Sequence, residues 1–181
     1  MPGRSEFLQA RVALIRAPDQ LAPLANMTRG YPLRVGAAEI ATSEHLYQAS
    51  KVPNPQRGLI VAAATGHQAK AAAYTLTEWW REDWTDIRVS VMEWCLAVKL
   101  TQHWNAIAPV LAGTGGLPIV EWSRRDDFWG AVPGEPGTLV GYNILGKLWD
   151  RLRDIAAEGD AARVTTAVPY ELAGDWTWPA R

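Results

Sequence analysis

The sequence predicts a mainly α-helical, compact single domain with a few short β-strands. The chain has 181 residues, a length that suits one sizeable core. Stretches with helical spacing of apolar residues outnumber the short segments that resemble strands. No linker rich in proline, glycine or serine and no internal repeat divides the chain. We therefore expect one domain over residues 1–181.

Three short strands are expected, and the segment before the second of them is irregular. The strand candidates are residues 11–16, 33–40 and 117–121. Residues 33–40 form either a strand or one arm of a hairpin. The irregular segment covers residues 18–32, which begin and end with proline.

Six helical segments are expected, several of them directly after residues that cap helices. They cover residues 44–51, 56–64, 67–76, 84–98, 104–111 and 142–157. Thr42 or Ser43 can cap the first helix. Thr65 can cap the third and Asp83 the fourth. Pro109 either limits the fifth helix to an early turn or kinks it, because proline removes a helix hydrogen bond.

Charge and cysteine content narrow the class of protein. The formal net charge of −1 argues against a general nucleic-acid binder, yet it allows a short nucleic-acid segment or a nucleotide-sized ligand. Cys95 is the single cysteine, so no intramolecular disulfide forms and a reducing compartment is expected. No apolar run approaches the roughly 20 residues of a membrane helix. We expect a cytoplasmic protein with no membrane partner.

The ten tryptophans are the most unusual feature of the composition. A tryptophan side chain carries a large apolar surface, so most of the ten are expected in the core. A minority can line a pocket that stacks on a flat ring.

The stretch TSEHLYQ, residues 42–48, carries the first candidate catalytic group, Glu44. At helical spacing Glu44 shares one face with Tyr47, Gln48 and Lys51. The helix dipole at a first turn favours the ionised form of a carboxyl group. An ionised Glu44 suits binding of ribose hydroxyls or stabilisation of developing positive charge. The alternative is that Glu44 only marks the start of a helix.

A second group of charged residues lies in RRDDFWG, residues 124–130. A carboxylate here can pair with Glu44 in an acid/base arrangement, and the arginines can meet phosphates. The alternative is a surface turn with weak local ion pairs.

Lys70 lies in an alanine-rich helix. If small neighbours partly remove its amine from water, the amine can act as a nucleophile. The alternative is a solvated lysine on the surface of the helix.

No metal site and no cofactor are predicted. His45, His67 and His103 have no metal-ligand spacing with one another or with Cys95. Cys95 lies in an apolar helical stripe and is expected to be a buried, inert thiol. The run Gly-Thr-Gly-Gly at residues 113–116 is expected to end a helix, because it lacks the lysine of a phosphate loop.

Taken in order along the chain, these stretches resemble the NADAR family, which includes YbiA-like N-glycosidases. The resemblance covers about residues 24–155. It is carried by residues 24–27, 42–48, 69–70, 83–84, 88, 92, 99–100, 111, 114–115, 119–121, 126–130 and 141–146. Two departures are Ala25, where the family usually has serine, and the three alanines 71–73 in place of bulkier residues.

The resemblance implies a compact, mostly helical YbiA-like fold and hydrolysis of an N-glycosidic bond to ribose. It implies active positions at Glu44, Trp84 and Asp126. Lys70 falls on a position that is often lysine in the family. The positions expected to shape the ligand cleft are Asn26, Trp129, Gly130, Asn143 and Gly146. We also expect Arg124 or Arg125 to contact the pyrophosphate of ADP-ribose.

Two substrate classes follow from the resemblance. One branch of the family cleaves ribosylamine intermediates of riboflavin biosynthesis. The other resembles antitoxins that remove ADP-ribose from guanine bases of DNA and so oppose a DarT-type toxin. The motifs of this sequence are more similar to those of the antitoxin branch. A non-catalytic ADP-ribose-binding module and a helical interaction protein are the remaining alternatives.

Overall fold

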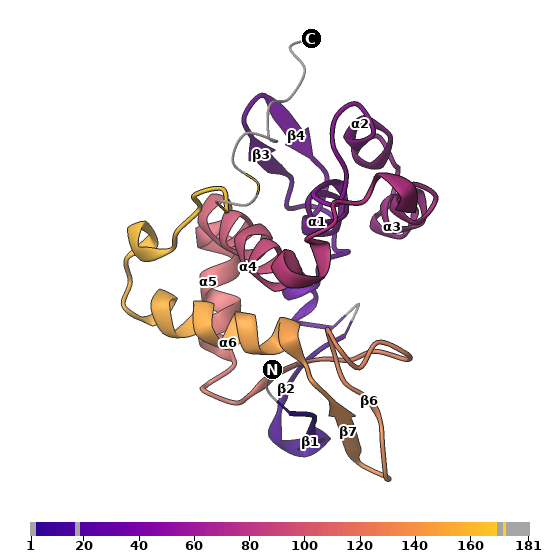
Figure 1. Ribbon diagram of the computed structural model, residues 1–181. Helices are drawn as coiled ribbons and strands as arrows, with labels where there is room; N and C mark the ends of the chain where they lie inside the picture. Colours follow the sequence, from indigo (N-terminus) through magenta and orange to yellow (C-terminus); the bar gives the residue numbers. More distant parts are fainter. Residues whose placement is uncertain (1–2, 17–18, 170–171, 173–181) are drawn as a thin grey trace. The chain divides into compact units, whose positions relative to one another are not determined.

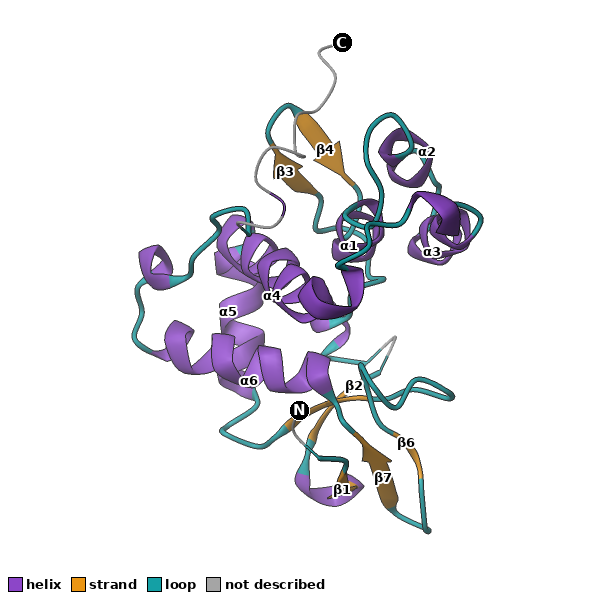
Figure 2. Cartoon of the chain, viewed as in Figure 1, coloured by secondary structure: helices purple, strands orange, loops and turns teal. Residues whose placement is uncertain are grey.

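The computed structural model describes residues 3–16, 19–169 and 172 (Figure 1). Trp176 and Trp178 lie outside the described residues. The chain divides into two compact units, one formed by Met1–Ala25 with Trp104–Val164 and one formed by Asn26–His103 with Thr165–Arg181. Helices with a few short strands make up both units (Figure 2), so the prediction of a mainly α fold is confirmed. The single-domain assignment stays a prediction.

Three short helices pack pairwise in the second unit, and the first of them also packs on a long helix (Figure 1). These helices are α1 (Ser43–Ala49), α2 (Arg57–Val61), α3 (Gly66–Tyr74) and α4 (Trp84–Gln102). Alanines at the contacts between the short helices let their backbones approach closely. Ala49, Ala69 and Ala73 are fully buried there, together with Val52 and Ile60. All four helices coincide with predicted segments.

Threonine side chains cap α1 and α3 as the sequence predicts. Thr42 Oγ1 accepts a hydrogen bond from the His45 amide at 3.4 Å, and Thr65 Oγ1 accepts one from Gln68 at 3.2 Å. The predicted cap of α4 is wrong. Asp83 precedes α4, but its side chain makes no cap bond and instead accepts a hydrogen bond from Arg81 at 2.9 Å.

Removing the Thr42 cap is expected to cost more stability than removing the Thr65 cap. Thr42 is fully buried and its Oγ1 also lies 2.8 Å from His45 Nδ1, whereas Thr65 is exposed. Loss of a cap costs about 0.5–2 kcal/mol, so Thr42→Ala should fall near the top of this range and Thr65→Ala near the bottom. Urea denaturation of the two variants measures the difference. Equal losses would contradict a buried double role for Thr42.

A β-hairpin precedes α1 in the second unit. β3 (Leu33–Val35) pairs antiparallel with β4 (Ala38–Ile40), and Gly36 takes the positive φ of 57° that the turn requires. Residues 33–40 are thus both arms of a hairpin, whereas the sequence predicted one strand or one arm.

The first unit contains the remaining strands and two helices (Figure 1). β1 (Ser5–Leu8), β7 (Thr138–Gly141) and β6 (Val132–Pro133) form an antiparallel sheet in that order, and β2 (Ala13–Ile15) pairs parallel with β5 (Ile119–Glu121). The strands β2 and β5 agree with prediction. The strands β1, β6 and β7 were not predicted.

Two helices, α5 (Trp104–Gly113) and α6 (Ile144–Ala157), pack on each other in this unit. Pro109 lies inside α5, so the prediction that it limits this helix to an early turn is wrong. The Asn105 carbonyl, which loses its helix donor to Pro109, belongs to an exposed residue and can bond to water. In the described part of the chain, no helix combines the length and the apolar character needed to cross a membrane.

Candidate active site

The ten predicted site residues divide between the two units. The second unit contains Asn26, Glu44, Lys70 and Trp84. The first unit contains Arg124, Asp126, Trp129, Gly130, Asn143 and Gly146. The expectation that Glu44 and Asp126 face the same sugar stays a prediction.

Glu44 and Asn26 come together through the main chain at the start of α1. The Glu44 amide donates a hydrogen bond to the Asn26 carbonyl oxygen at 3.2 Å. Both side chains are buried, with 6% and 8% of their surface exposed. Gln48, one helical turn further on, donates from Nε2 to Glu44 Oε1 at 2.7 Å. This places a carboxyl and two amide groups at one buried location.

Burial controls the protonation of Glu44. Desolvation is the largest influence and raises its pKa, while the Gln48 hydrogen bond and the charges of Lys70, Lys51 and His67 act in the lowering direction. The sequence predicted the opposite, an ionised form favoured by the helix dipole. Removal of the carboxylate from water outweighs the influences that lower this pKa.

Several buried polar atoms beside Glu44 have no hydrogen-bond partner within the described residues. They are Asn26 Oδ1, Ser43 Oγ and Gln48 Oε1. A buried acceptor without a partner is costly, and native proteins retain few of them. Two of these atoms are amide oxygens, which accept hydrogen bonds from hydroxyl groups. The arrangement suits a ligand rich in hydroxyls, such as a sugar.

Four aromatic rings surround the amine of Lys51, which follows α1 and is only 3% exposed. The distances from Lys51 Nζ to the ring centroids are 4.1 Å for Trp80, 4.8 Å for Tyr74, 5.5 Å for Trp84 and 5.6 Å for Tyr47. We name Tyr47, Tyr74, Trp80 and Trp84 the aromatic cage. A cation within about 6 Å of a ring is attracted to its face. The rings therefore attract the protonated form of this amine, whereas burial lowers its pKa to about 8.

Trp84 belongs to this cage, and the charge of Lys70 acts on both Glu44 and Lys51. Trp84 is 7% exposed, and its ring centroid lies 5.0 Å from that of Tyr47. The predicted site residue Trp84 is therefore a wall of the cage. Lys70 is partly buried on α3, and its charge acts on Glu44.

In the first unit, Asp126 organises the loop that carries the predicted aromatic residue. Its Oδ1 accepts hydrogen bonds from the Phe128 and Trp129 amides at 3.2 and 2.9 Å. The Phe128 and Trp129 rings meet edge to face at 5.0 Å. Arg124, on the same loop, is exposed. The loop thus fixes a carboxyl group and a tryptophan close in sequence to a solvent-exposed cation.

Asn143, Gly130 and Gly146 fix this loop onto β5 and α6. Asn143 Oδ1 accepts from the Glu121 amide at 3.0 Å, and Asn143 Nδ2 donates to the Ile119 carbonyl at 2.8 Å. A side chain at Gly130 would collide with the Glu121 carbonyl, and one at Gly146 with the Ile119 carbonyl. These residues position the loop through the backbone.

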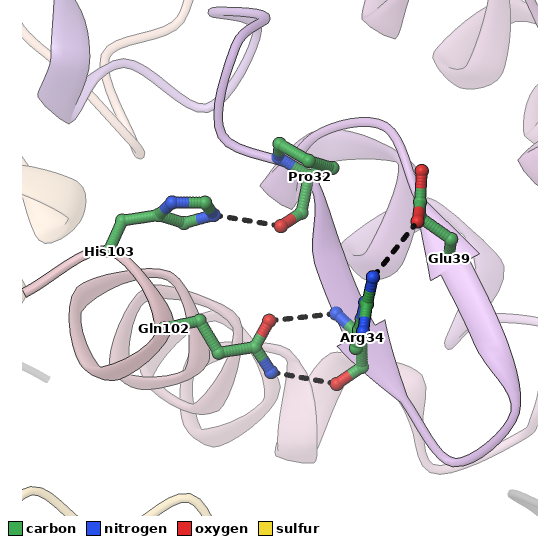
Figure 3. A pocket seen from close by; sticks show the side chains of 5 residues that line it. All are labelled: Pro32, Arg34, Glu39, Gln102 and His103. Atoms are coloured by element: carbon green, nitrogen blue, oxygen red, sulfur yellow. Dashed lines mark hydrogen bonds and ion pairs between the residues drawn. The ribbon is translucent and has the colours of Figure 1, made fainter.

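A cavity of about 450 Å³ lies between the β3–β4 hairpin and the end of α4 (Figure 3). Its lining includes none of the predicted site residues. Gln102 bonds to both the amide and the carbonyl of Arg34, at 2.8 and 2.7 Å, and His103 Nε2 bonds to the Pro32 carbonyl at 2.8 Å. The polar groups of this cavity thus join the hairpin to α4.

His45 and Cys95 are both packed in the interior of the protein. His45 is fully buried and bonds through Nε2 to the Ala63 carbonyl at 3.0 Å. Cys95 is fully buried in α4, and burial raises the pKa of its thiol well above the usual value. The prediction that Cys95 is buried is confirmed, and its inertness stays a prediction. The described residues include no group of three or more metal-binding side chains.

Sequence reasoning missed part of the second unit's site. Helical spacing placed Gln48 and Lys51 on the face of Glu44, but neither was selected as a site residue. Tyr74 and Trp80 come from the end of α3 and the segment after it. No periodicity links them to α1, so only the packing of the helices reveals the cage.

Comparison with known proteins gives the same family for most of the chain. The family described as "NADAR domain" matches residues 17–155. A riboflavin biosynthesis protein of Vibrio vulnificus is 29% identical over 154 residues, which is 83% of this chain and 40% of that protein. This chain therefore spans less than half of that relative.

Two further relatives match over most of their own length. An N-glycosidase of Nostoc punctiforme is 34% identical over 118 residues, covering 63% of this chain and 72% of that protein. The NMR structure of the Escherichia coli protein YbiA superposes with a TM-score of 0.68 at 26% identity. The superposition covers 82% of this chain and 88% of that chain.

Proposed function

Because this chain belongs to the NADAR domain family, we propose that it is an N-glycosidase that hydrolyses a bond between ribose and nitrogen. The observation that carries the proposal is the buried group around Glu44. There a carboxyl with a raised pKa lies beside amide oxygens that have no hydrogen-bond partner within the described residues. The Nostoc relative is named an N-glycosidase.

The proposed substrate is ADP-ribose attached to a guanine base of DNA. The source of this modification would be a DarT-type ADP-ribosyltransferase, which the chain would oppose as an antitoxin. Arg124 is exposed and can contact the pyrophosphate. Trp129, held by the Asp126 loop, can stack on a base, a contact worth about 1–3 kcal/mol per base. The net charge of −1 favours recognition through ADP-ribose over the DNA backbone.

Cleavage of the bond builds positive charge on the ribose and leaves a nitrogen that needs a proton. We assign the proton transfer to Glu44, because burial raises the pKa of this carboxyl toward the working pH. Asp126 would orient hydroxyls or stabilise the charge on the sugar, since its loop holds it in one orientation. Lys70 would supply positive charge beside Glu44.

A second candidate substrate is a ribosylamine intermediate of riboflavin biosynthesis. The name of the Vibrio relative favours it. That protein extends well beyond the part matched here, so its name can describe activity located elsewhere in its chain.

We expect the purified protein to release ADP-ribose from an oligonucleotide that carries ADP-ribosylated guanine. Mass spectrometry of the products, with a ribosylamine of the riboflavin pathway assayed in parallel, measures the choice between substrates. Binding to the oligonucleotide should weaken only slightly between 50 and 200 mM salt, unlike the roughly 10³–10⁵-fold loss of a protein with many phosphate contacts. Hydrolysis of the ribosylamine alone would select the second candidate. Binding of ADP-ribose without hydrolysis of either compound would contradict both.

A further inference from the structure

The hydrolysis proposed for this site assigns no role to the side-chain amide of Gln48. We propose that Gln48 is a positioning residue for Glu44: its Nε2 holds Oε1 of the carboxyl group, so that Oε2 carries the proton that is transferred. The consequence for catalysis rests on the proposed function, whereas the hold on the carboxyl group rests on the packing and hydrogen bonds around α1.

The helix that carries both residues is held at its two ends. At its start, the Glu44 amide donates to the Asn26 carbonyl at 3.2 Å. Directly after its end, Ser50 Oγ donates back to the Leu46 carbonyl at 2.8 Å. All seven residues of α1 are buried. Glu44 and Gln48 are one turn apart on this helix, so their side chains meet on one face.

The stem of the Glu44 side chain is confined by α3. This helix packs on α1 and begins at Gly66. A Cβ added at Gly66 would lie 3.3 Å from Glu44 Cβ and 2.8 Å from Met27 Sδ. The backbone of α3 therefore lies directly against the stem of Glu44. Packing fixes one end of this side chain, and Gln48 fixes the other.

The amide of Gln48 is itself held in one orientation by an ionised Glu44. Gln48 is 2% exposed, and its Nε2 donates to Glu44 Oε1 at 2.7 Å, a length typical of a bond to a charged acceptor. In the reverse orientation the amide oxygen would face a carboxylate oxygen, and neither has a hydrogen to donate. The carboxylate therefore selects the orientation in which the amide nitrogen faces it.

This bond decides which oxygen of Glu44 holds the proton. A protonated carboxyl group has one hydroxyl oxygen and one carbonyl oxygen, and the carbonyl oxygen is the better acceptor. Oε1 accepts from Gln48, so Oε2 is the hydroxyl oxygen. In the transfer, the O–H bond of Oε2 breaks, its electron pair stays on the carboxylate, and the leaving nitrogen gains the proton.

The same bond becomes stronger as the proton leaves. Negative charge then spreads over both oxygens of Glu44, and a hydrogen bond to a charged acceptor is roughly twice as strong as one to a neutral acceptor. An interaction that is stronger in the transition state than in the ground state raises kcat. Gln48 thus assists the transfer without touching the reacting atoms.

Other groups also act on Glu44, and all of them remain when Gln48 is replaced. Burial is the largest influence on the pKa of Glu44 and raises it, and the Gln48 hydrogen bond comes next and lowers it. The positive groups that lower this pKa are Lys70 and His67 on α3 and Lys51 after α1. Burial raises the pKa of both Tyr47 and Cys95, which keeps these two neighbours uncharged.

Gln48→Met keeps a straight side chain and removes the donor. We expect kcat to fall roughly 10–100-fold, the range for one hydrogen bond to a charged group, with KM little changed. The alkaline limb of the pH–rate profile should move to higher pH, because loss of the bond raises the pKa of Glu44. Gln68→Met is the matched control, since Gln68 is exposed on α3.

A double-mutant cycle shows whether Gln48 acts through Glu44. In the Glu44→Gln background, Gln48→Met should have little further effect on kcat, because the carboxyl group that it positions is gone. Additive losses, or a fall in kcat with an unmoved alkaline limb, would overturn the positioning role.

The hold on the carboxyl group is measured without substrate. Carbon-13 NMR of the glutamate carboxyl groups, with the Glu44 signal assigned by its loss in Glu44→Gln, gives the pKa of Glu44. This pKa should be higher in Gln48→Met than in the natural protein and unchanged in Gln68→Met. In the natural protein, the side-chain amide protons of Gln48 should titrate with the same midpoint as Glu44.

The titration of the natural protein does not depend on whether Gln48→Met folds. Gln48 amide signals that do not follow Glu44, or an unchanged pKa of Glu44 in folded Gln48→Met, would overturn the inference even in a protein that hydrolyses its substrate. Coupled titration in a protein that hydrolyses neither candidate substrate would instead overturn the proposed function and support the hold on the carboxyl group.

Discussion

Replacing Glu44 with glutamine is expected to lower turnover by roughly 10²–10⁴-fold, the usual contribution of a group that transfers a proton in the transition state. Glutamine has nearly the same shape and keeps an oxygen that can accept the Gln48 hydrogen bond. The loss should appear in kcat more than in KM, because the missing proton transfer belongs to the transition state. Initial rates on whichever of the two candidate substrates is hydrolysed measure it.

The same substitution should leave stability unchanged or raise it, and this separates a working residue from a structural one. The pKa of Glu44 is raised in the folded protein, so above its unfolded value of 4.5 the folded state binds more protons than the unfolded state. Stability of the natural protein then falls as pH rises through the folded pKa, and the glutamine variant lacks this loss.

Thermal unfolding at pH 4 and pH 8 tests this. The difference in Tm, variant minus natural protein, should be larger at pH 8. Full activity of the variant would remove Glu44 from the mechanism. A marked fall in Tm at pH 8 would instead make its carboxylate a stabilising group.

Gly146→Ala is expected to cost more stability than the loss of either threonine cap. A Cβ at this position would overlap the Ile119 carbonyl oxygen and the Asn143 amide group. These atoms belong to β5 and to the residue that precedes α6, so they cannot move without disturbing the two Asn143 side-chain hydrogen bonds. We expect a loss of about 4 kcal/mol or a failure to fold, a size confined to a few severe mechanisms.

Gly58→Ala is the matched control for this loss. Gly58 also lies in a helix, α2, but an added Cβ there meets no atom within 4 Å. Alanine in a helix is more favourable than glycine by about 1 kcal/mol, so this variant should be as stable as the natural protein or slightly more so. Guanidinium denaturation gives both values. A loss below about 1 kcal/mol for Gly146→Ala would show that β5 and α6 can separate easily.

Helices were predictable from the sequence because their signals are local. Thr42 and Thr65 stand at helix starts, and the apolar positions of α4 and α6 recur at helical spacing. The strand β1 was missed because it is ordered by pairing with the distant β7, and β6 because it has only two residues. Asp83 illustrates the limit of local rules, since Arg81 competes for its carboxylate.

Contacts of the candidate site within one helix were predictable from the sequence. Contacts that depend on how two helices pack against each other were not. Glu44 and Gln48 are one turn apart, so their contact follows from helical geometry. Lys51 meets Tyr74 and Trp80 only because α3 packs against α1. The direction in which the pKa of Glu44 shifts likewise depends on burial, and the position of a residue in a helix does not reveal its burial.

The side chain of Gln102 has a consequence for how this protein behaves at high concentration. A two-stranded hairpin leaves unpaired backbone groups along its outer edges, and such edges can recruit a strand from another molecule. Gln102 occupies both the amide and the carbonyl of Arg34, the central residue of β3. One amide side chain on α4 thus replaces a neighbouring strand and closes that edge to self-association.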